Sequence, residues 1–354
     1  MIGRLETRAF RNLVDGAVDL SARLVVVEGG NAQGKTSLLE AVYAVATTRS
    51  FRTRDIRETI RHGEPEMSVR ALVRQGSGAG LELGLTVRRE RGGRALFVGE
   101  SRVKLPEYIG LVPALALAGD SVRAMKGSPA ERRRFVDRAA AAARPEHLRD
   151  LGEYRRALGH RNQLLRDAAP DAAFAPWDEL LARAGERIVS RRREELVAWQ
   201  AQIDAWPELF PEGGTARLSY RRAGGEDLLA ALARARDTDR RLRRTTVGPH
   251  RDDLRFEVGG RDLLRFGSAG QVRAALSALT LAQVRAIRRS RPGTEPVLIL
   301  DDVDTDLDAG RRHALLSAAR QEAQTFASTT ERGLARALDP LRLSVVAGRT
   351  EARA

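Results

Sequence analysis

Four residues near the start of the chain have the types and spacing of a phosphate-binding loop. Gly29, Gly34, Lys35 and Thr36 fit the pattern G-x-x-x-x-G-K-[ST]. In such a loop the backbone amides surround phosphate oxygens, the lysine reaches the β and γ phosphates, and the hydroxyl is offered to Mg²⁺. A plain glycine turn before a helix is the alternative. The nucleotide-binding residues predicted here are Gly29, Gly30, Asn31, Ala32, Gln33, Gly34, Lys35, Thr36 and Ser37.

A second chemical signal lies far along the chain, where an apolar run ends in two aspartates. The run from Val297 to Leu300 has the pattern of a buried parallel strand, and ligands bind at the carboxyl ends of such strands. We expect Asp301 to coordinate Mg²⁺ and Asp302 to orient or deprotonate the attacking water. Lys35 and Asp302 are the expected catalytic residues, and Thr36 and Asp301 the expected metal ligands. Two solvated aspartates capping a turn are the alternative.

A third signal is the start of a long amphipathic helical pattern between Phe266 and Arg289. Ser268, Gly270 and Gln271 stand at its beginning, where exposed amides and a hydroxyl form an anion site. An ordinary helix cap has the same appearance. Taken alone, this stretch does not decide between a phosphate site and a cap.

The elements around these residues predict a nucleotide-binding fold of the α/β class. The segment from Arg23 to Gly29 is β-branched and apolar, and Ser37 to Val45 has helical spacing, so the loop joins a strand to a helix. Alternating segments separated by glycine-rich turns predict an antiparallel sheet in the N-terminal part. Longer helical patterns follow from about Ser121 to Arg244, interrupted by prolines at several places.

Three segments follow from this pattern. Residues 1–120 are expected to hold the N-terminal part of the nucleotide-binding head with the antiparallel β subdomain, and 121–244 an inserted α-helical second domain. From Thr246 strand and helix signals alternate again, so residues 245–354 are expected to complete the head.

The composition points to a polyanionic partner. The chain has 354 residues and a formal net charge of +14, and basic side chains gain affinity by releasing counterions from a phosphate backbone. Aromatic residues make up 5%, which favours backbone contacts to duplex DNA over base stacking. The alternative is a bias of the composition towards arginine, because all basic residues other than Lys35, Lys104 and Lys126 are arginines.

The sequence has no cysteine, so no thiolate metal site is expected. It also has no membrane-spanning run, so we expect a cytoplasmic protein.

The order of these motifs is that of ABC-type ATPase heads, and the sequence resembles the RecF family of bacterial recombination mediators. The resemblance covers nearly the whole length. It rests on the segments RAFRNL, GGNAQGKTSLLEA, RSFRT, KGSPAERRRFVDR, YRRALGHRNQLL, TTVGPHRDDL, FGSAGQVRAAL and LILDDVDTDLD. Individually most of these motifs are weak, and together, in order, they are specific.

The resemblance implies an ATP-dependent homodimer and a weak, DNA-stimulated ATPase. ATP with Mg²⁺ would lie between two heads, with Ser268, Gly270 and Gln271 of one chain reaching the γ-phosphate held by Lys35 of the other. Binding would close a clamp on duplex DNA beside single-stranded gaps, and hydrolysis would open it. RecR and RecO are the implied protein partners, and RecA is reached indirectly. The roles of Arg8–Asn12, Arg49–Thr53 and Gly248–Asp253 stay open.

Three departures from the family pattern stand in the sequence. Asp306 replaces a glutamate, so Asp308 is the safer equivalent, and Gly119 precedes Asp120 where an acidic residue is common. No histidine follows the strand expected at Thr325–Thr330, taken as the last strand. Slow turnover is expected, with Thr329 as a weak substitute sensor. A transporter-type ATPase subunit and a nucleotide-gated structural DNA-binding protein without turnover are the competing functions.

Overall fold

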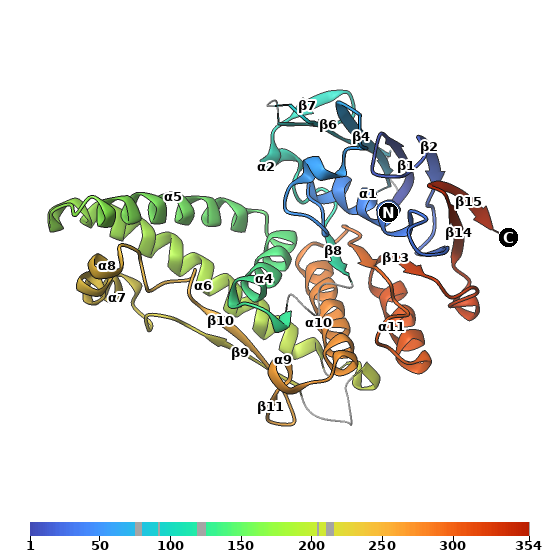
Figure 1. The fold of residues 1–354 in the computed structure, drawn as a ribbon. Helices are drawn as coiled ribbons and strands as arrows, with labels where there is room; N and C mark the ends of the chain where they lie inside the picture. Colours follow the sequence, from blue (N-terminus) through green and yellow to red (C-terminus); the bar gives the residue numbers. More distant parts are fainter. Residues whose placement is uncertain (75–79, 91–92, 119–124, 204, 210–215, 354) are drawn as a thin grey trace. The chain divides into compact units, whose positions relative to one another are not determined.

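The computed structural model describes residues 1–74, 80–90, 93–118, 125–203, 205–209 and 216–353 (Figure 1). The chain forms two compact units. The first contains Met1–Val122, Ala205–Gly213 and Ser268–Ala354, and the second contains Arg123–Asp204 and Gly214–Gly267. Gly119 and Asp120, singled out above, lie outside the described residues. Within the described part of the chain, no helix is long and apolar enough to cross a bilayer.

A six-stranded sheet with the order β15-β14-β3-β13-β12-β8 forms the centre of the first unit. Its strands are β3 (Leu24–Glu28), β8 (Ala114–Leu117), β12 (Val297–Leu300), β13 (Gln324–Thr329), β14 (Leu341–Val346) and β15 (Arg349–Arg353). From β14 to β8 all neighbours run parallel, and β15 pairs antiparallel at the edge. Every residue of β3, β12 and β13 is buried, as expected for parallel strands covered on both faces. The strands expected at Arg23–Gly29 and Val297–Leu300 are confirmed.

The strand at Thr325–Thr330 is not the last one of the chain. It is β13, and two more strands, β14 and β15, follow it. β14 pairs with β3 on the side away from β13. Both strands that flank β3 therefore come from the C-terminal part of the chain. The sequence pattern missed β14 because its arginine and serine interrupt the apolar run.

Helices α1, α10 and α11 are the long helices that the first unit contributes in the described residues. Their bounds, with the shorter helices of this unit, are α1 (Lys35–Thr47), η1 (Ile56–Thr59), α2 (Leu105–Tyr108), η3 (Pro207–Leu209), α10 (Ala269–Ser290), α11 (Ala309–Glu322) and η5 (Arg336–Leu338). The helix expected after the phosphate loop is α1. Every residue from Val272 to Val284 of α10 is buried, so this helix exposes less than an amphipathic pattern predicts. Its buried hydroxyls are satisfied within the helix: Ser277 donates to the carbonyl of Arg273 and Thr280 to that of Leu276.

The expected antiparallel sheet is present, with the order β2-β1-β4-β5-β6-β7. Its strands are β1 (Ile2–Arg8), β2 (Gly16–Asp19), β4 (Glu66–Val73), β5 (Leu81–Arg88), β6 (Arg94–Val98) and β7 (Ser101–Val103). β4 alternates buried and less buried residues, the period of a sheet with one face on a core. Helix α1 contacts β4 and β5 of this sheet and β8 and β13 of the parallel sheet.

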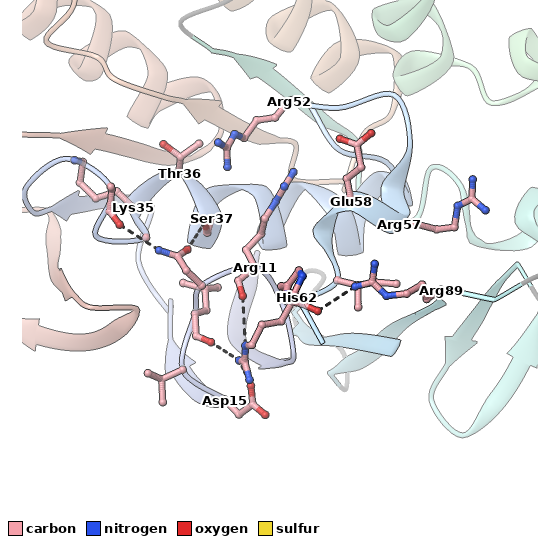
Figure 2. Close-up of a pocket in the computed structure, with 17 residues that line it drawn as sticks. Arg11, Asp15, Lys35, Thr36, Ser37, Arg52, Arg57, Glu58, His62 and Arg89 are labelled. Atoms are coloured by element: carbon pink, nitrogen blue, oxygen red, sulfur yellow. Dashed lines mark hydrogen bonds and ion pairs between the residues drawn. The ribbon is translucent and has the colours of Figure 1, made fainter. Parts of the chain in front are cut away.

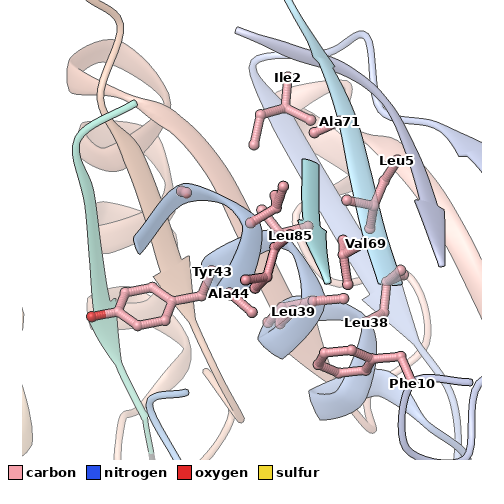
Figure 3. Close-up of a cluster of buried hydrophobic side chains, with 14 of the residues drawn as sticks. Ile2, Leu5, Phe10, Leu38, Leu39, Tyr43, Ala44, Val69, Ala71 and Leu85 are labelled. Carbon is pink, nitrogen blue, oxygen red and sulfur yellow. The ribbon is translucent and has the colours of Figure 1, made fainter. Parts of the chain in front are cut away.

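One apolar core therefore joins both sheets through α1. Figure 3 shows Leu38 and Leu39 of α1 among side chains of the antiparallel sheet, including Val69 and Leu85, whereas the ring of Tyr43 extends away from them. Leu39, Val69 and Leu85 are fully buried. Burying a large aliphatic side chain contributes roughly 1.5–3 kcal/mol. The helix that opens with Lys35 and Thr36 is thus anchored along its length by hydrophobic burial.

The second unit is mainly helical and also contains a small sheet. Its elements are α4 (Pro129–Ala143), α5 (Glu146–Arg166), η2 (Asp171–Ala173), α6 (Ala175–Ile203), β9 (Ala216–Arg221), α7 (Leu228–Arg234), α8 (Arg236–Leu242), β10 (Asp253–Val258), β11 (Arg261–Asp262) and α9 (Leu263–Phe266). Helices α5 and α6 pack on each other, and α6 also contacts α4, α7 and β9. The strands pair in the antiparallel order β11-β10-β9.

The end of the second unit differs from the expected boundary at Arg244. Residues 245–267 belong to this unit because β10 pairs with β9 from Asp253↔Arg221 to Val258↔Ala216. The strand and helix signals after Thr246 are real, but they build the small sheet of the second unit. The first unit resumes at Ser268.

The Gly248–Asp253 segment ties the elements of the second unit together. The Tyr154 hydroxyl of α5 and Nδ1 of His250 lie 2.7 Å apart, and Nε2 of His250 lies 3.1 Å from the carbonyl of Thr245. Since that carbonyl only accepts, Nε2 carries the proton and Nδ1 accepts from Tyr154. Arg192 of α6 donates to the carbonyl of Pro249 at 2.8 Å. These contacts are architectural, which gives the segment a role that the sequence left open.

Candidate nucleotide site

The phosphate loop connects the end of β3 to the start of α1, as the motif requires. Gly34 is the residue before the helix and has φ of 114°, a left-handed conformation that a side chain disfavours. The loop amides between Gly30 and Gly34 donate no hydrogen bond to the protein in the part of the chain that the structure describes. Together with the amino end of α1, these free donors form an anion site.

Lys35 lies inside this loop. Its ammonium donates to the carbonyls of Gly29 and Gly30, both at 2.9 Å, and the residue is 5% exposed. An ammonium group has three donors, so one donor is free for a phosphate oxygen. The loop thus holds a cation at its centre.

Thr36 meets the second motif directly. Its hydroxyl donates to Oδ1 of Asp301 at 3.0 Å, across 265 residues of sequence. β3 and β12 flank β13 and run parallel, so their carboxyl ends lie at one edge of the sheet. The structure therefore brings together the two motifs that the sequence placed in one site.

Ser328, at the end of β13, completes this edge and was missed by the sequence analysis. Its buried hydroxyl donates to Oδ1 of Asp301 at 2.7 Å and accepts from the backbone amide of Asp302 at 2.8 Å. Burial raises the pKa of Asp301, and the hydrogen bond from Ser328 opposes this. The sequence does show a serine near the end of an apolar strand. Its role follows only from the strand order, which places β13 between β3 and β12.

The oxygens at this edge suit a hard divalent cation. The Thr36 hydroxyl and the Asp301 carboxylate lie 3.0 Å apart, and both are oxygen donors of the type that Mg²⁺ takes alongside substrate phosphates. The residues present therefore fit Mg²⁺ bound with a nucleotide. Asp302 follows with φ of 49°, a strained conformation for a residue with a side chain.

The start of α10 is a complete helix cap. The Ser268 hydroxyl accepts from the amide of Gln271 at 3.2 Å, and the Gln271 side chain accepts from the amide of Ser268 at 3.0 Å. A Cβ on Gly270 would lie 2.9 Å from the carbonyl of Asp306, so the cap packs closely on the loop after β12. Among the described residues, no hydrogen bond joins Ser268, Gly270 or Gln271 to the phosphate loop of the same chain.

Arg273, two residues further along α10, was also missed. It is 2% exposed and donates to the carbonyls of Ala118 and Asp301, both at 2.8 Å. A third, longer bond reaches the carbonyl of Asp302 at 3.4 Å. Burial lowers the pKa of Arg273, and the nearby aspartates raise it. The helix with the candidate signature motif is thus bonded to the aspartate-bearing end of β12.

The loop after β12 carries the remaining acidic residues of the motif. Asp306 has φ of 62°, and Asp308 caps α11 by accepting from the amide of Arg311 at 2.9 Å. The Thr329 hydroxyl donates to Asp304 at 3.1 Å and accepts from the amide of Glu331 at 2.9 Å. Its hydroxyl is therefore engaged by the protein.

Two arginine-containing motifs with open roles converge on one carboxylate of α1. Arg11 donates to both oxygens of Glu40, at 2.9 and 2.8 Å, and Arg52 reaches Glu40 at 3.4 Å. Ser50 donates to Glu40 as well. Glu40 is fully buried, so it needs these partners. The motifs position the segments that frame the helix of the phosphate loop.

Residues around Arg11 and Arg52 line an open pocket of about 1210 Å³ beside the phosphate loop. Figure 2 shows Lys35 and Thr36 on one side and Arg89 on the other. The lining is strongly basic, with arginines 11, 52, 57, 61 and 89, Lys35 and His62 against Asp15 and Glu58. A site of this size and charge fits an anionic ligand such as a nucleotide.

Sequence relatives identify the family of the chain. The DNA replication and repair protein RecF of Symbiobacterium thermophilum is 35% identical over 344 residues, covering 93% of this chain and 91% of that protein. The chain belongs to the RecF family. The RecF protein of Myxococcus xanthus is 36% identical over 374 residues, covering 99% of this chain and 97% of that protein. No family model matches the chain.

Solved structures agree with this family. A RecF structure described as the recombination mediator RecF with ATP in the RecFOR pathway has a TM-score of 0.89 and 25% identity, covering 100% of this chain and 97% of that one. The Smc head domain from Pyrococcus furiosus has a TM-score of 0.58 and 17% identity, covering 99% of this chain and 95% of that one. The expected α/β class and ATPase-head fold are therefore confirmed.

Proposed function

We propose that this RecF-family chain is an ATP-dependent, DNA-binding recombination mediator that dimerises on ATP. The observation that carries the proposal is the hydrogen bond between Thr36 and Asp301, which joins the phosphate loop to the carboxylate edge of the sheet. The RecF relatives named for DNA replication and repair support it, as does the similar RecF structure with ATP.

ATP is proposed to bind with its phosphates in the loop between Gly29 and Ser37. The amides of Gly30 to Gly34 and the third donor of Lys35 are available for the phosphate oxygens. The basic pocket beside the loop is proposed to hold the ribose and base. His62 in its lining offers an imidazole ring for a hydrogen bond to the ligand.

Mg²⁺ is proposed to be held by Thr36 and Asp301, and when bound it neutralises charge on the transferring phosphate. Ser328 fixes the Asp301 carboxylate from the side of β13. Asp302 is proposed to accept a proton from the attacking water. Its backbone, held by Ser328, orients this carboxylate relative to Asp301.

The other half of the site is proposed to come from a second copy of the chain. Ser268, Gly270 and Gln271 lie at the amino end of a 22-residue helix, and Ser268 is exposed. The resemblance to head-to-head ATPases supports a role across a dimer interface. ATP binding would close the dimer, and slow, DNA-stimulated hydrolysis would open it.

The protein is proposed to bind duplex DNA next to single-stranded gaps. RecO and RecR are its proposed protein partners, and together they would help to load RecA. The net charge of +14 supports a nucleic-acid partner. The RecFOR pathway named for the similar RecF structure supports the protein partners.

Two substitutions test the composite site. Lys35→Ala is expected to abolish ATP binding, whereas Ser268→Arg is expected to bind ATP as a monomer and not hydrolyse it. Ser290→Arg, at the exposed far end of α10, is the matched control and should dimerise normally. Light scattering with and without ATP gives the mass, and calorimetry gives ATP binding. An ATP-dependent dimer of Ser268→Arg would disprove the composite site.

A further inference from the structure

The turn between β14 and β15 lies against the phosphate loop. Ala347 and Gly348 form the two-residue connection, with φ of 49° and 79°, as in type I′ hairpin turns. The amide of Ala347 donates to Oε1 of Gln33 at 2.7 Å, and the amide of Gly348 donates to the carbonyl of Gln33 at 2.9 Å. Gln33 is thus held at its side chain and at its main chain by a turn 314 residues later.

The same turn also contacts the loop that follows β1. The carbonyl of Gly348 accepts from the amide of Val14 at 2.8 Å. Asn12 of that loop donates to the carbonyl of Ala32 at 3.2 Å and accepts from the Ser37 hydroxyl at 2.7 Å. Three segments therefore hold one another in place around the phosphate loop.

The packing leaves almost no room for the turn to shift. A Cβ on Gly348 would lie 1.9 Å from the carbonyl oxygen of Asn12, and the φ of 79° also disfavours a side chain. A Cβ on Gly34 would contact Gly348 at 3.4 Å and Val345 at 3.3 Å. Close approach of two main chains at both glycines couples the shape of the loop to the position of the turn.

We propose that the β14–β15 turn is a positioning element of the nucleotide site and acts through Gln33. By occupying the Gln33 carbonyl and side chain, it keeps the loop in the conformation that leaves the amides of Gly30 to Gly34 free for phosphate oxygens. Gln33 is a positioning residue in this scheme. The inference rests on the proposed binding of ATP at this loop.

The test is the affinity for MgATP measured by titration calorimetry, together with the melting temperature without nucleotide. Gln33→Met keeps the length of the side chain and removes the acceptor for Ala347, together with a longer bond of 3.4 Å that Gln33 donates to the Asn31 carbonyl, and we expect about tenfold weaker MgATP binding. The melting temperature should change little, because Gln33 is only half-buried. Val346→Ser is the matched control on the same hairpin, since Val346 is 61% exposed, and it should leave the affinity unchanged.

A double-mutant cycle separates an effect through the turn from direct contact with the nucleotide. Gly348→Ala should also weaken MgATP binding, and the double variant with Gln33→Met should be little weaker than either single variant, since residues that act as one unit are not additive. Fully additive losses, or unchanged affinity in Gln33→Met, would overturn the inference. If Gly348→Ala fails to fold, Gln33→Met against Val346→Ser still decides. Failure of the unmodified protein to bind MgATP would instead disprove the proposed function.

Discussion

The buried guanidinium of Arg273 donates to the main-chain carbonyl of Asp301 at 2.8 Å, linking the candidate signature helix to the carboxylate edge of the parallel sheet. The same group donates to Ala118 at the end of the neighbouring strand β8. One side chain of α10 thus joins the ends of two strands. In the proposed dimer, a movement of α10 would be transmitted to the aspartates through these bonds.

Arg273→Met is therefore expected to reduce both stability and turnover. The substitution fills similar space but removes the hydrogen bonds that Arg273 donates to the carbonyls of Ala118 and Asp301, which costs about 2–4 kcal/mol in the free energy of unfolding. Urea unfolding measures this loss. Arg289→Met, at an exposed position of the same helix, should stay within about 0.5 kcal/mol of the unmodified protein. Equal effects of the two substitutions would contradict a special role for Arg273.

Asp302→Asn should bind ATP but hydrolyse it at least about a hundredfold more slowly, because the amide cannot accept the proton of the attacking water. Phosphate release under saturating MgATP is the measurement. Asp237→Asn removes an exposed carboxylate in the second unit and serves as the control. An unchanged rate in Asp302→Asn would remove the mechanism and favour a nucleotide-gated DNA-binding protein without turnover.

Ser328→Ala should raise the Mg²⁺ concentration needed for half-maximal hydrolysis. The hydroxyl holds Oδ1 of Asp301 and the amide of Asp302, and loss of such a supporting group typically costs about 10-fold or more in metal affinity. Hydrolysis measured over a range of Mg²⁺ concentrations checks this. Saturating Mg²⁺ should restore most of the rate, and a loss that Mg²⁺ does not relieve would point to misfolding of the sheet edge instead.

Stability should fall as the pH drops from about 7 towards 4, in part through His250. Burial lowers the pKa of His250 to about 4; the hydrogen bond to the Thr245 carbonyl and the charge of Asp239 oppose this effect, and Arg251 and Arg133 add to it. Between the ordinary pKa near 6.5 and this value, the unfolded state binds more protons than the folded state, so stability rises with pH in that window. At pH 5 the loss from this group is about 2 kcal/mol.

His250→Gln tests the assignment, because an amide can donate to the Thr245 carbonyl and accept from Tyr154 without titrating. Urea unfolding at several pH values should show a flatter profile for the variant between pH 4 and 6.5. Identical slopes for the two proteins would mean that other groups produce the pH dependence.

Binding to duplex DNA should weaken steeply with salt if phosphate contacts supply the affinity. We expect a loss of at least about a hundredfold between roughly 50 and 200 mM salt, as for proteins with several phosphate contacts. Fluorescence anisotropy with a labelled duplex measures it, and melting temperatures at the same salt concentrations confirm that the protein stays folded. A flat salt profile would argue that the net charge of +14 is a bias of composition.

Local patterns were enough to predict the phosphate loop, the strand before Asp301 and the helix from Ser268. Each of these depends on neighbouring residues: periodicity for the strand and helix, and a fixed spacing for Lys35 and Thr36. The resemblance to a family then placed them in one site. The contact between Thr36 and Asp301 agrees with that placement.

The rest depended on contacts between distant segments. Ser328 and Arg273 look ordinary along the chain, and their roles come from the strand order and from the packing of α10. The sequence predicted that the head resumes at residue 245, which is too early. The segment β10 has a good strand pattern but pairs with β9 of the second unit. Nothing in the local sequence of the turn at Ala347 and Gly348 predicts its contact with Gln33.

The position of β3 has a consequence for synthesis on the ribosome. Both of its partner strands, β13 and β14, come from the last part of the chain, as does Asp301, 265 residues after Thr36. At translation rates of about 5–20 residues per second, roughly 13–50 s pass between the appearance of the two residues. During this delay the backbone N–H and C=O groups along both edges of β3 lack their partner strands. Until β13 and β14 have been made, β3 is therefore a template on which another chain could pair.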